Sequence, residues 1–168
     1  TWVSECALDF IAEDRTPGTP WMLTLNPYSP HEPLIPPRVY ADQFNPADMP
    51  GPHFQESDLA QQEALEDIVF QTRGQHPDTF NGKKHQALYY AMIKQIDDQF
   101  ARILDGLERA GQRDNTIIIF TSDHGEALGD HGLLWKGCRF YEGLVRVPLI
   151  FSWPGHIQAK LQSDALVE

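Results

Sequence analysis

The sequence predicts an α/β fold in which a mainly parallel sheet is sandwiched by helices, and of which these 168 residues form an incomplete part. Three observations lead to this class. A long helical pattern covers residues 83–110, and two unbroken apolar runs follow it at 116–121 and 147–153. Apolar runs without alternation are typical of strands buried on both faces, as in a parallel sheet covered by helices.

The elements of the first half are predicted from periodicity and from the positions of proline and glycine. Residues 2–13 carry apolar side chains on one helical face, and the segment Thr16–Pro20 ends that pattern. A short apolar strand is expected at 21–25. The following prolines predict an irregular loop, and a weaker helical pattern covers residues 57–72.

The clearest helix is predicted in the second half. An apolar side chain recurs every three or four positions, which places one continuous stripe on a helix. The stripe consists of Leu88, Met92, Ile96, Phe100, Ile103 and Leu107. Gly111 stands where a helix commonly ends in a left-handed residue. The two apolar strands at 116–121 and 147–153 come next.

Composition excludes several classes of protein. The chain has 24 acidic and 13 basic residues, which gives a formal net charge of −11 and argues against binding to duplex nucleic acid or to an anionic membrane. No apolar run approaches the ~20 residues of a membrane-spanning helix. Its two cysteines, Cys6 and Cys138, are too few for a disulfide framework or a zinc set. Neither the compartment nor the oligomeric state follows from these numbers.

Both ends of the sequence have the character of a cut rather than of a natural terminus. Residue 1 is Thr, and a helical pattern is already under way at Val3. The last residues, 164–168, contain no closing feature. We therefore expect residues 1–168 to be an internal fragment of one domain of a longer protein.

Chemically versatile side chains gather directly after the 116–121 strand. The string Ser122–Glu126 contains Asp-His-Gly, a second Asp-His-Gly occupies 130–132, and Trp135–Gly137 follows. Ligands of open α/β sheets bind beyond the carboxyl ends of the strands, where this string is expected to lie. Asp offers oxygen to a divalent cation, and Lys offers a point charge to an oxyanion. The sequence therefore predicts a cation and anion site at this sheet edge.

The order of these motifs resembles the sulfatase family of the alkaline phosphatase superfamily. The resemblance is carried by residues 119–133 and 135–137, and by Tyr141-Glu142 with the Val145–Ile150 segment. Pro30-His31-Glu32-Pro33 upstream and the Asp-Asp of the long helix also match the family. The resemblance extends over nearly the whole chain and is weakest over 45–82. The resemblance implies an alkaline phosphatase-like fold, and it implies that residues 1–168 belong to one sulfatase catalytic domain.

Four residues acquire roles from this resemblance. Asp123 matches the metal-binding aspartate of the family, and His124 matches the neighbouring position, for which contact with the metal, with the sulfate or with the nucleophile stays open. Lys136 matches the lysine that holds the sulfate and assists the leaving group. His31 matches a histidine that contacts the sulfate ester and donates a proton to the leaving oxygen. The implied cofactor is a divalent metal ion, Ca²⁺ first, with Mg²⁺ and Mn²⁺ as alternatives.

Other charged residues near these motifs are expected to have structural roles. His131 should brace its loop through hydrogen bonds, and Glu126 and Asp130 should support the ligands rather than bind metal. Asp97 and Asp98 are adjacent on a helix and point about 100° apart, which argues against a metal pair. Arg146 is also expected to have a structural role, as the partner of Glu142 in an ion pair.

One family motif is absent. Sulfatases use a cysteine in a Cys-x-Pro-Ser-Arg string, converted to formylglycine, as the nucleophile, and neither Cys6 nor Cys138 lies in such a string. The resemblance therefore implies a metal-dependent sulfatase acting on a sulfate-ester small molecule or glycan, with its nucleophile upstream and this fragment inactive alone. Two alternatives stay open. They are a phosphonate monoester or phosphodiester hydrolase of the same superfamily, and a non-catalytic relative.

Overall fold

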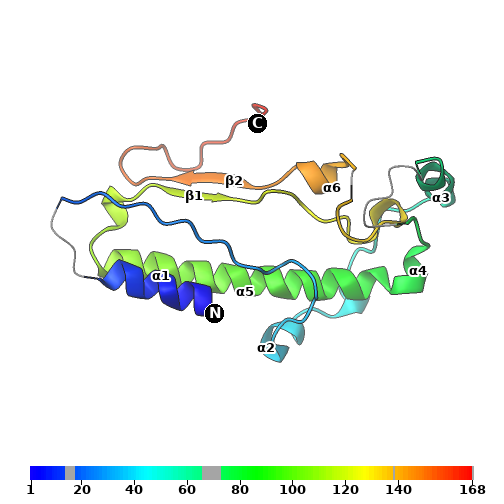
Figure 1. The fold of residues 1–168 in the computed structure, drawn as a ribbon, viewed down its shortest axis with the longest axis horizontal. Helices are drawn as coiled ribbons and strands as arrows, with labels where there is room; N and C mark the ends of the chain where they lie inside the picture. The colour runs from blue at the N-terminus through cyan, green and yellow to red at the C-terminus, as the bar shows by residue number, and fades with distance from the viewer. Residues whose placement is uncertain (14–17, 66–72, 138, 168) are drawn as a thin grey trace.

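The structure is a computed structural model that describes residues 1–13, 18–65, 73–137 and 139–167. Figure 1 shows one long helix, α5, with α1 packed near one end, a two-stranded sheet beside it and short helices toward its other end. The helices are α1 (Trp2–Ala12), α2 (Arg38–Ala41), α3 (Glu56–Glu63), α4 (Pro77–Phe80), α5 (Gly82–Arg109) and α6 (Glu142–Val145). Three 3₁₀ turns, η1 (Pro46–Asp48), η3 (Arg113–Asn115) and η4 (Asp130–Gly132), and the strands β1 (Ile118–Thr121) and β2 (Leu149–Ser152) complete the described elements.

Helix α5 is the element that the apolar stripe predicts, and it has 28 residues. The Asn81 side chain accepts a hydrogen bond from the backbone N–H of Lys84 at 3.1 Å, which caps the first turn. The chain leaves the helix through Gly111, whose φ of +65° lies in the left-handed region that favours glycine. None of the described helices is both long enough and apolar enough to cross a membrane.

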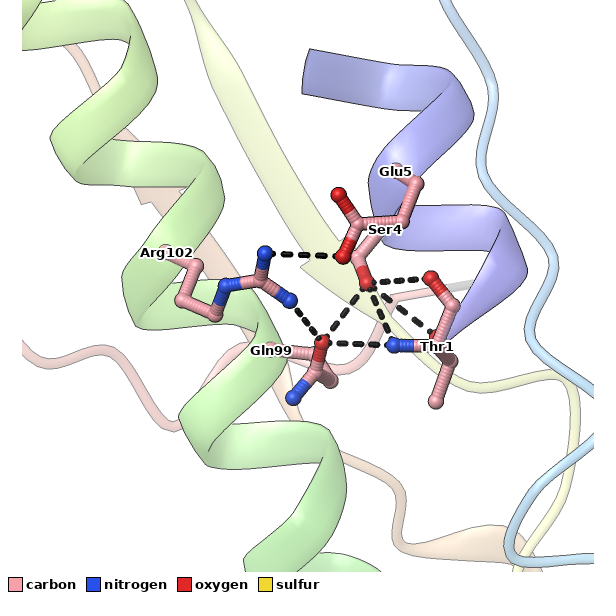
Figure 2. A network of polar contacts seen from close by, with 5 residues as sticks. All are labelled: Thr1, Ser4, Glu5, Gln99 and Arg102. Atoms are coloured by element: carbon pink, nitrogen blue, oxygen red, sulfur yellow. Dashed lines mark hydrogen bonds and ion pairs between the residues drawn. The ribbon is translucent and has the colours of Figure 1, made fainter.

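Helix α1 is also confirmed, and it packs against α5 through small and buried residues. A Cβ at Gly106 would lie 2.5 Å from Leu8 Cδ2, so glycine lets the two helices approach closely. Figure 2 shows the polar contacts beside this packing, in which Ser4 Oγ donates to Gln99 Oε1 at 2.7 Å. Ser4 is 2% exposed, so this hydroxyl needs its partner. An ion pair at 2.8 Å joins Arg102 of α5 to Glu5 of α1.

The two strands confirm the positions of the apolar runs but not their parallel direction. β1 pairs with β2 antiparallel, with Ile118 opposite Ser152 and Thr121 opposite Leu149. Parallel neighbours need a long crossover, usually a helix, to return the chain to the same end of the sheet. The connection from β1 to β2 holds only short helical turns among its described residues, so the chain reverses direction there. The α/β class itself is confirmed.

The apolar runs also predict burial on both faces of the strands, whereas the described residues cover only one face of β1 and leave most of β2 exposed. Phe120 of β1 faces α5 and contacts the ring of Phe100 with centroids 5.3 Å apart. On the other face, Ile119 is 58% exposed and its cross-strand neighbour Phe151 is 50% exposed, and Ile150, which lies opposite Phe120, is 55% exposed. Exposed large apolar side chains in adjacent strands form a surface that is unusual for a complete monomeric domain.

Two other predicted elements differ in part. Residues 21–25 form no ladder with a described strand, although their exposure alternates as in an extended segment. Trp21 instead packs edge-on against Phe10 of α1, with ring centroids 5.6 Å apart. Of the helix predicted at 57–72, the structure shows α3, and the stretch 66–72 lies outside the described residues.

Candidate active site

The first part of the site is the turn that follows β1. Ser122 Oγ donates to the carbonyl of His124 at 2.7 Å, and the backbone N–H of His124 donates to Asp123 Oδ1 at 3.0 Å. These local bonds turn the chain out of the strand and leave the Asp123 side chain 87% exposed. Burial acts to raise the pKa of this carboxyl, but the nearby His124 and the hydrogen bonds outweigh it. The pKa of Asp123 therefore lies below its ordinary value, and the group is ionised at neutral pH.

The loop beyond this turn is held by close backbone contacts and a small core. A Cβ at Gly125 would lie 1.9 Å from the carbonyl oxygen of Gly143, so only glycine fits at position 125. The Gly125 N–H donates to the carbonyl of Leu144 at 2.7 Å. Ala127, Leu133 and Leu144 form a buried cluster below the loop, with Leu133 only 2% exposed. This core keeps the two Asp-His-Gly motifs in one compact unit.

The second part of the site is a contact between residues that are 105 positions apart. Lys136 Nζ lies 2.6 Å from His31 Nε2. An ammonium group only donates hydrogen bonds, so Nε2 is the acceptor. The other ring nitrogen, Nδ1, lies 3.0 Å from the carbonyl oxygen of Glu32, which can only accept. The geometry therefore assigns a neutral His31 ring with its proton on Nδ1.

The loop around His31 orients its ring. The Tyr28 ring lies against the His31 ring with centroids 5.1 Å apart. Tyr28 also donates its hydroxyl hydrogen to the carbonyl of Glu32 at 2.6 Å. The same carbonyl therefore accepts from both rings and links them. His31 is exposed and Lys136 is half-buried, so the pair is accessible from solvent.

Two carboxyl groups lie near this pair. Burial raises the pKa of Glu126, and the negative charge of Glu32 adds to the increase while Lys136 opposes it. Burial also raises the pKa of Glu32, and the charge of Lys136 opposes this increase. Burial and Glu126 together raise the pKa of the Tyr89 hydroxyl to about 12. Lys136 thus lies among groups whose charge depends on pH.

Asp123 and His124 are suitable for part of a cation site. His124 Nδ1 lies 2.7 Å from the carbonyl of Gly125 and donates to it, which leaves Nε2 with a free lone pair 3.8 Å from Asp123 Oδ2. A carboxylate oxygen and an imidazole nitrogen at this separation can bind one ion. Among the described residues, no group of three such donors converges. Within the part of the chain that the structure describes, Asp123 and His124 therefore form a pair of donors.

The predicted site residues form two pairs in the structure. Lys136 contacts His31, and His124 is adjacent to Asp123, but no hydrogen bond or ion pair between described residues joins one pair to the other. His131 braces its loop as expected, since its backbone N–H donates to the carbonyl of His53 at 2.8 Å. The supporting residue Asp130 accepts from the His53 N–H at 2.8 Å.

The charged residues that were expected to have structural roles form ion pairs. Asp97 and Asp98 both pair with Lys94. Arg146 lies 3.7 Å from Glu142, and both of these side chains are exposed. His76 lies 3.3 Å from Glu56 and 3.4 Å from Asp78.

Two polar residues of α3 that contact the site loop were not indicated by the sequence. Asp58 and Gln62 are 7% and 3% exposed, and both contact side chains of the site loop. The available signal was their spacing of four, which places them on one helical face. Polar residues at that spacing usually face solvent, so the pattern alone did not reveal burial.

Comparison with known proteins identifies the family. The sequence profile named Sulfatase matches residues 3–168. This chain belongs to the sulfatase family. That family is part of the alkaline phosphatase superfamily, and solved structures with alkaline phosphatase-like folds match the chain.

Relatives of this sulfatase-family chain carry several names. It is 36% identical over 163 residues to an arylsulfatase of Clostridium perfringens, covering 93% of this chain and 32% of that protein. It is 32% identical over 139 residues to a choline-sulfatase of Rhizobium meliloti, covering 81% and 27%. A phosphonate monoester hydrolase of Agrobacterium radiobacter has a similar structure, with a TM-score of 0.75, 32% identity, and 93% and 34% coverage. The chain spans about a third of the length of the curated relatives it matches.

Proposed function

We propose that the complete protein hydrolyses sulfate esters, and that Lys136 and His31 act on the sulfate group and on the alcohol that leaves. The observation that carries this proposal is the 2.6 Å contact between Lys136 Nζ and His31 Nε2 in a chain of the sulfatase family. The resemblance of both motifs to those of the family supports placing the two residues at the sulfate end of the substrate. Their contact supports a shared role.

Lys136 has the chemistry to stabilise the transition state. An ammonium carries three donors, and one of them is used on His31. Two donors remain for sulfuryl oxygens, on which negative charge grows as the ester reacts. Donors held in place before the reaction stabilise such charge more than donors that must reorient.

His31 and Lys136 can also hold the proton that the alcohol needs. A hydrogen bond from Nζ to Nε2 joins two basic nitrogens, so a single proton can lie on either one. The proton on Nδ1 is fixed by the Glu32 carbonyl and leaves Nε2 as the nitrogen that exchanges. Delivery of that proton to the departing oxygen is the proposed general acid step.

Asp123 and His124 would supply two ligands to a divalent cation. We propose Ca²⁺, with Mg²⁺ and Mn²⁺ as alternatives, and the low pKa of Asp123 keeps its carboxylate available for this purpose. When bound, such a cation stabilises negative charge on the ester oxygens. The nucleophile, a formylglycine in this proposal, comes from outside the 168 residues, because neither cysteine of the chain lies in a Cys-x-Pro-Ser-Arg string.

A pocket next to the Lys136–His31 contact is the proposed place for the alcohol part of the substrate. It has a volume of about 600 Å³ and contains Glu32 and Trp135, the sequence neighbours of the two residues. Its remaining walls come from the proline-rich loop and from residues 78–88. Aromatic and polar walls of this kind fit a ring that carries hydroxyl groups.

The second candidate is phosphonate monoester or phosphodiester hydrolysis, which the similarity to the Agrobacterium structure favours. The test compares kcat/KM of the mature, metal-loaded complete protein on an aryl sulfate, an aryl phosphonate monoester and an aryl phosphodiester. We expect the sulfate to be the best substrate. A higher value for a phosphorus ester would assign the second candidate. Absence of turnover with all three would contradict both and leave a non-catalytic relative.

A further inference from the structure

Two buried polar residues on α3 face the loop that carries Lys136. Asp58 and Gln62 are one helical turn apart, so their side chains lie on the same face. They are 7% and 3% exposed. Burial of polar groups is unfavourable unless they are hydrogen-bonded, so the contacts they make matter for this face.

Asp58 contacts the beginning of the loop. One carboxylate oxygen accepts the Gln55 N–H at 2.7 Å, and the other lies 3.6 Å from His131 Nδ1, which is ion-pair distance. The His131 ring stacks on the Tyr141 ring, with centroids 4.0 Å apart and an angle of 17° between the planes. Asp58 therefore contacts a ring that is itself held by the far end of the loop.

Gln62 contacts the end of the loop with both of its polar atoms. Its Nε2 donates to the Tyr141 hydroxyl at 2.9 Å. Its Oε1 accepts from Arg139 Nε at 3.0 Å. The amide nitrogen of Gln62 therefore acts as a donor and its amide oxygen as an acceptor, so both polar atoms of the side chain are hydrogen-bonded.

These contacts bracket Lys136. His131 and Tyr141 each stand five positions from Lys136, one on either side. Backbone bonds reinforce the first end, since the carbonyl of Gly132 accepts the Gln75 N–H at 2.8 Å. Contacts therefore hold the chain at His131 before Lys136 and at Tyr141 after it, and the position of Lys136 opposite His31 depends on these two points.

We propose that Asp58 and Gln62 of α3 are positioning residues that hold Lys136 in contact with His31. This inference rests on the proposed function for its effect on catalysis, while the contact itself can be measured without activity. A displacement of about 1 Å in a catalytic group can reduce the rate about 10²-fold. Loss of the Gln62 bonds should therefore reduce kcat while KM changes little, because the lost interaction belongs to the transition state.

The kinetic test uses matched variants of the complete protein. Gln62→Leu removes both hydrogen bonds, whereas Gln62→Glu keeps acceptors for the Tyr141 hydroxyl and Arg139. We expect Gln62→Leu to lower kcat about 10- to 100-fold and Gln62→Glu to restore most of it. Ser4→Ala, which removes a buried hydrogen bond on α1, controls for general destabilisation and should leave kcat unchanged.

A double-variant cycle separates positioning from stability. If Gln62 acts through Lys136, Gln62→Leu should reduce kcat no further in a Lys136→Ala background. An equal loss of kcat in both backgrounds would overturn the proposal. Tyr141→Phe, which keeps the stacked ring but removes the hydroxyl, replaces Gln62→Leu if that variant does not fold.

A spectroscopic arm is independent of turnover. The ¹³Cε1 resonance of His31, assigned by its loss in His31→Gln, reports the contact with Lys136. We expect this resonance to move in Gln62→Leu and to stay in place in Gln62→Glu and Ser4→Ala. A wild-type protein without activity, combined with this shift, would remove the proposed function and keep the positioning role. An unchanged His31 resonance in Gln62→Leu would remove the positioning role, whatever the activity.

Discussion

Replacing Lys136 and His31 by alanine, singly and together, tests whether the two residues that contact each other also act together in catalysis. Lys136→Ala deletes the donor to Nε2 of His31 and the two ammonium donors that remain for the substrate. Loss of one donor to a developing oxyanion typically reduces kcat by about 10²–10³. Because Lys136 contacts the group that all sulfate esters share, the loss should be similar for every leaving alcohol.

His31→Ala should depend on the leaving group. A general acid contributes about 10²–10⁴, and its contribution falls when the alcohol is acidic enough to leave unprotonated. A series of aryl and alkyl sulfates with rising leaving-group pKa should therefore show a steeper slope for His31→Ala than for the wild-type protein. Parallel slopes would show that His31 only positions the sulfate and would make Lys136 the better candidate for the acid.

The double variant tests whether the pair acts as a unit. Independent residues would lose the product of the single effects, about 10⁴–10⁷. Since one hydrogen bond joins them, we expect the double variant to lose little more than the worse single variant, about 10²–10⁴. Lys160→Ala, which removes an exposed lysine, serves as the matched control. A multiplicative loss in kcat/KM of an aryl sulfate would refute the shared role.

Three further predictions concern the supporting residues. Asp123→Asn should weaken Ca²⁺ binding sharply in calorimetry of the complete protein, because one anionic ligand is lost, and equal affinity would remove Asp123 from the cation site. Glu126→Gln should raise the thermal midpoint relative to wild type at about pH 8 but not at about pH 4. The reason is that a pKa raised by burial makes ionisation oppose folding, so the stability present below the ordinary value of 4.5 is lost as pH rises through the folded pKa. An equal difference at both pH values would show that the charge of Glu126 is not responsible. Leu133→Ala should lower the free energy of unfolding by about 2–5 kcal/mol in urea titration, and a change below about 1 kcal/mol would show that the cluster under the loop does not stabilise it.

The elements predicted most completely from the sequence were those with long periodic patterns. The stripe from Leu88 to Leu107 predicted α5 nearly to its ends, because apolar side chains that recur at the helical period over so many turns fit a helix and not a strand. The motif order also located the turn with Asp123 and the lysine at 136. The parallel direction expected for the two strands was not found, since an apolar run alone does not distinguish parallel from antiparallel pairing.

The contacts that assemble the site could not be predicted from the residues alone. His31 and Lys136 are 105 positions apart, and Gln62 and Tyr141 are 79 apart. Periodicity reports only local geometry, so pairing over such separations requires the fold. The family resemblance supplied the first pair, while the second pair had no motif to indicate it.

The roles proposed for Lys136 and His31 are tested most directly by a crystal structure of the complete protein with a sulfamate analogue of an aryl sulfate. Our prediction is that the sulfamate oxygens lie within hydrogen-bond distance of Lys136 Nζ, and that the bridging oxygen lies within reach of His31 Nε2 or Lys136 Nζ. An analogue bound elsewhere, with Lys136 and His31 still in contact only with each other, would contradict it.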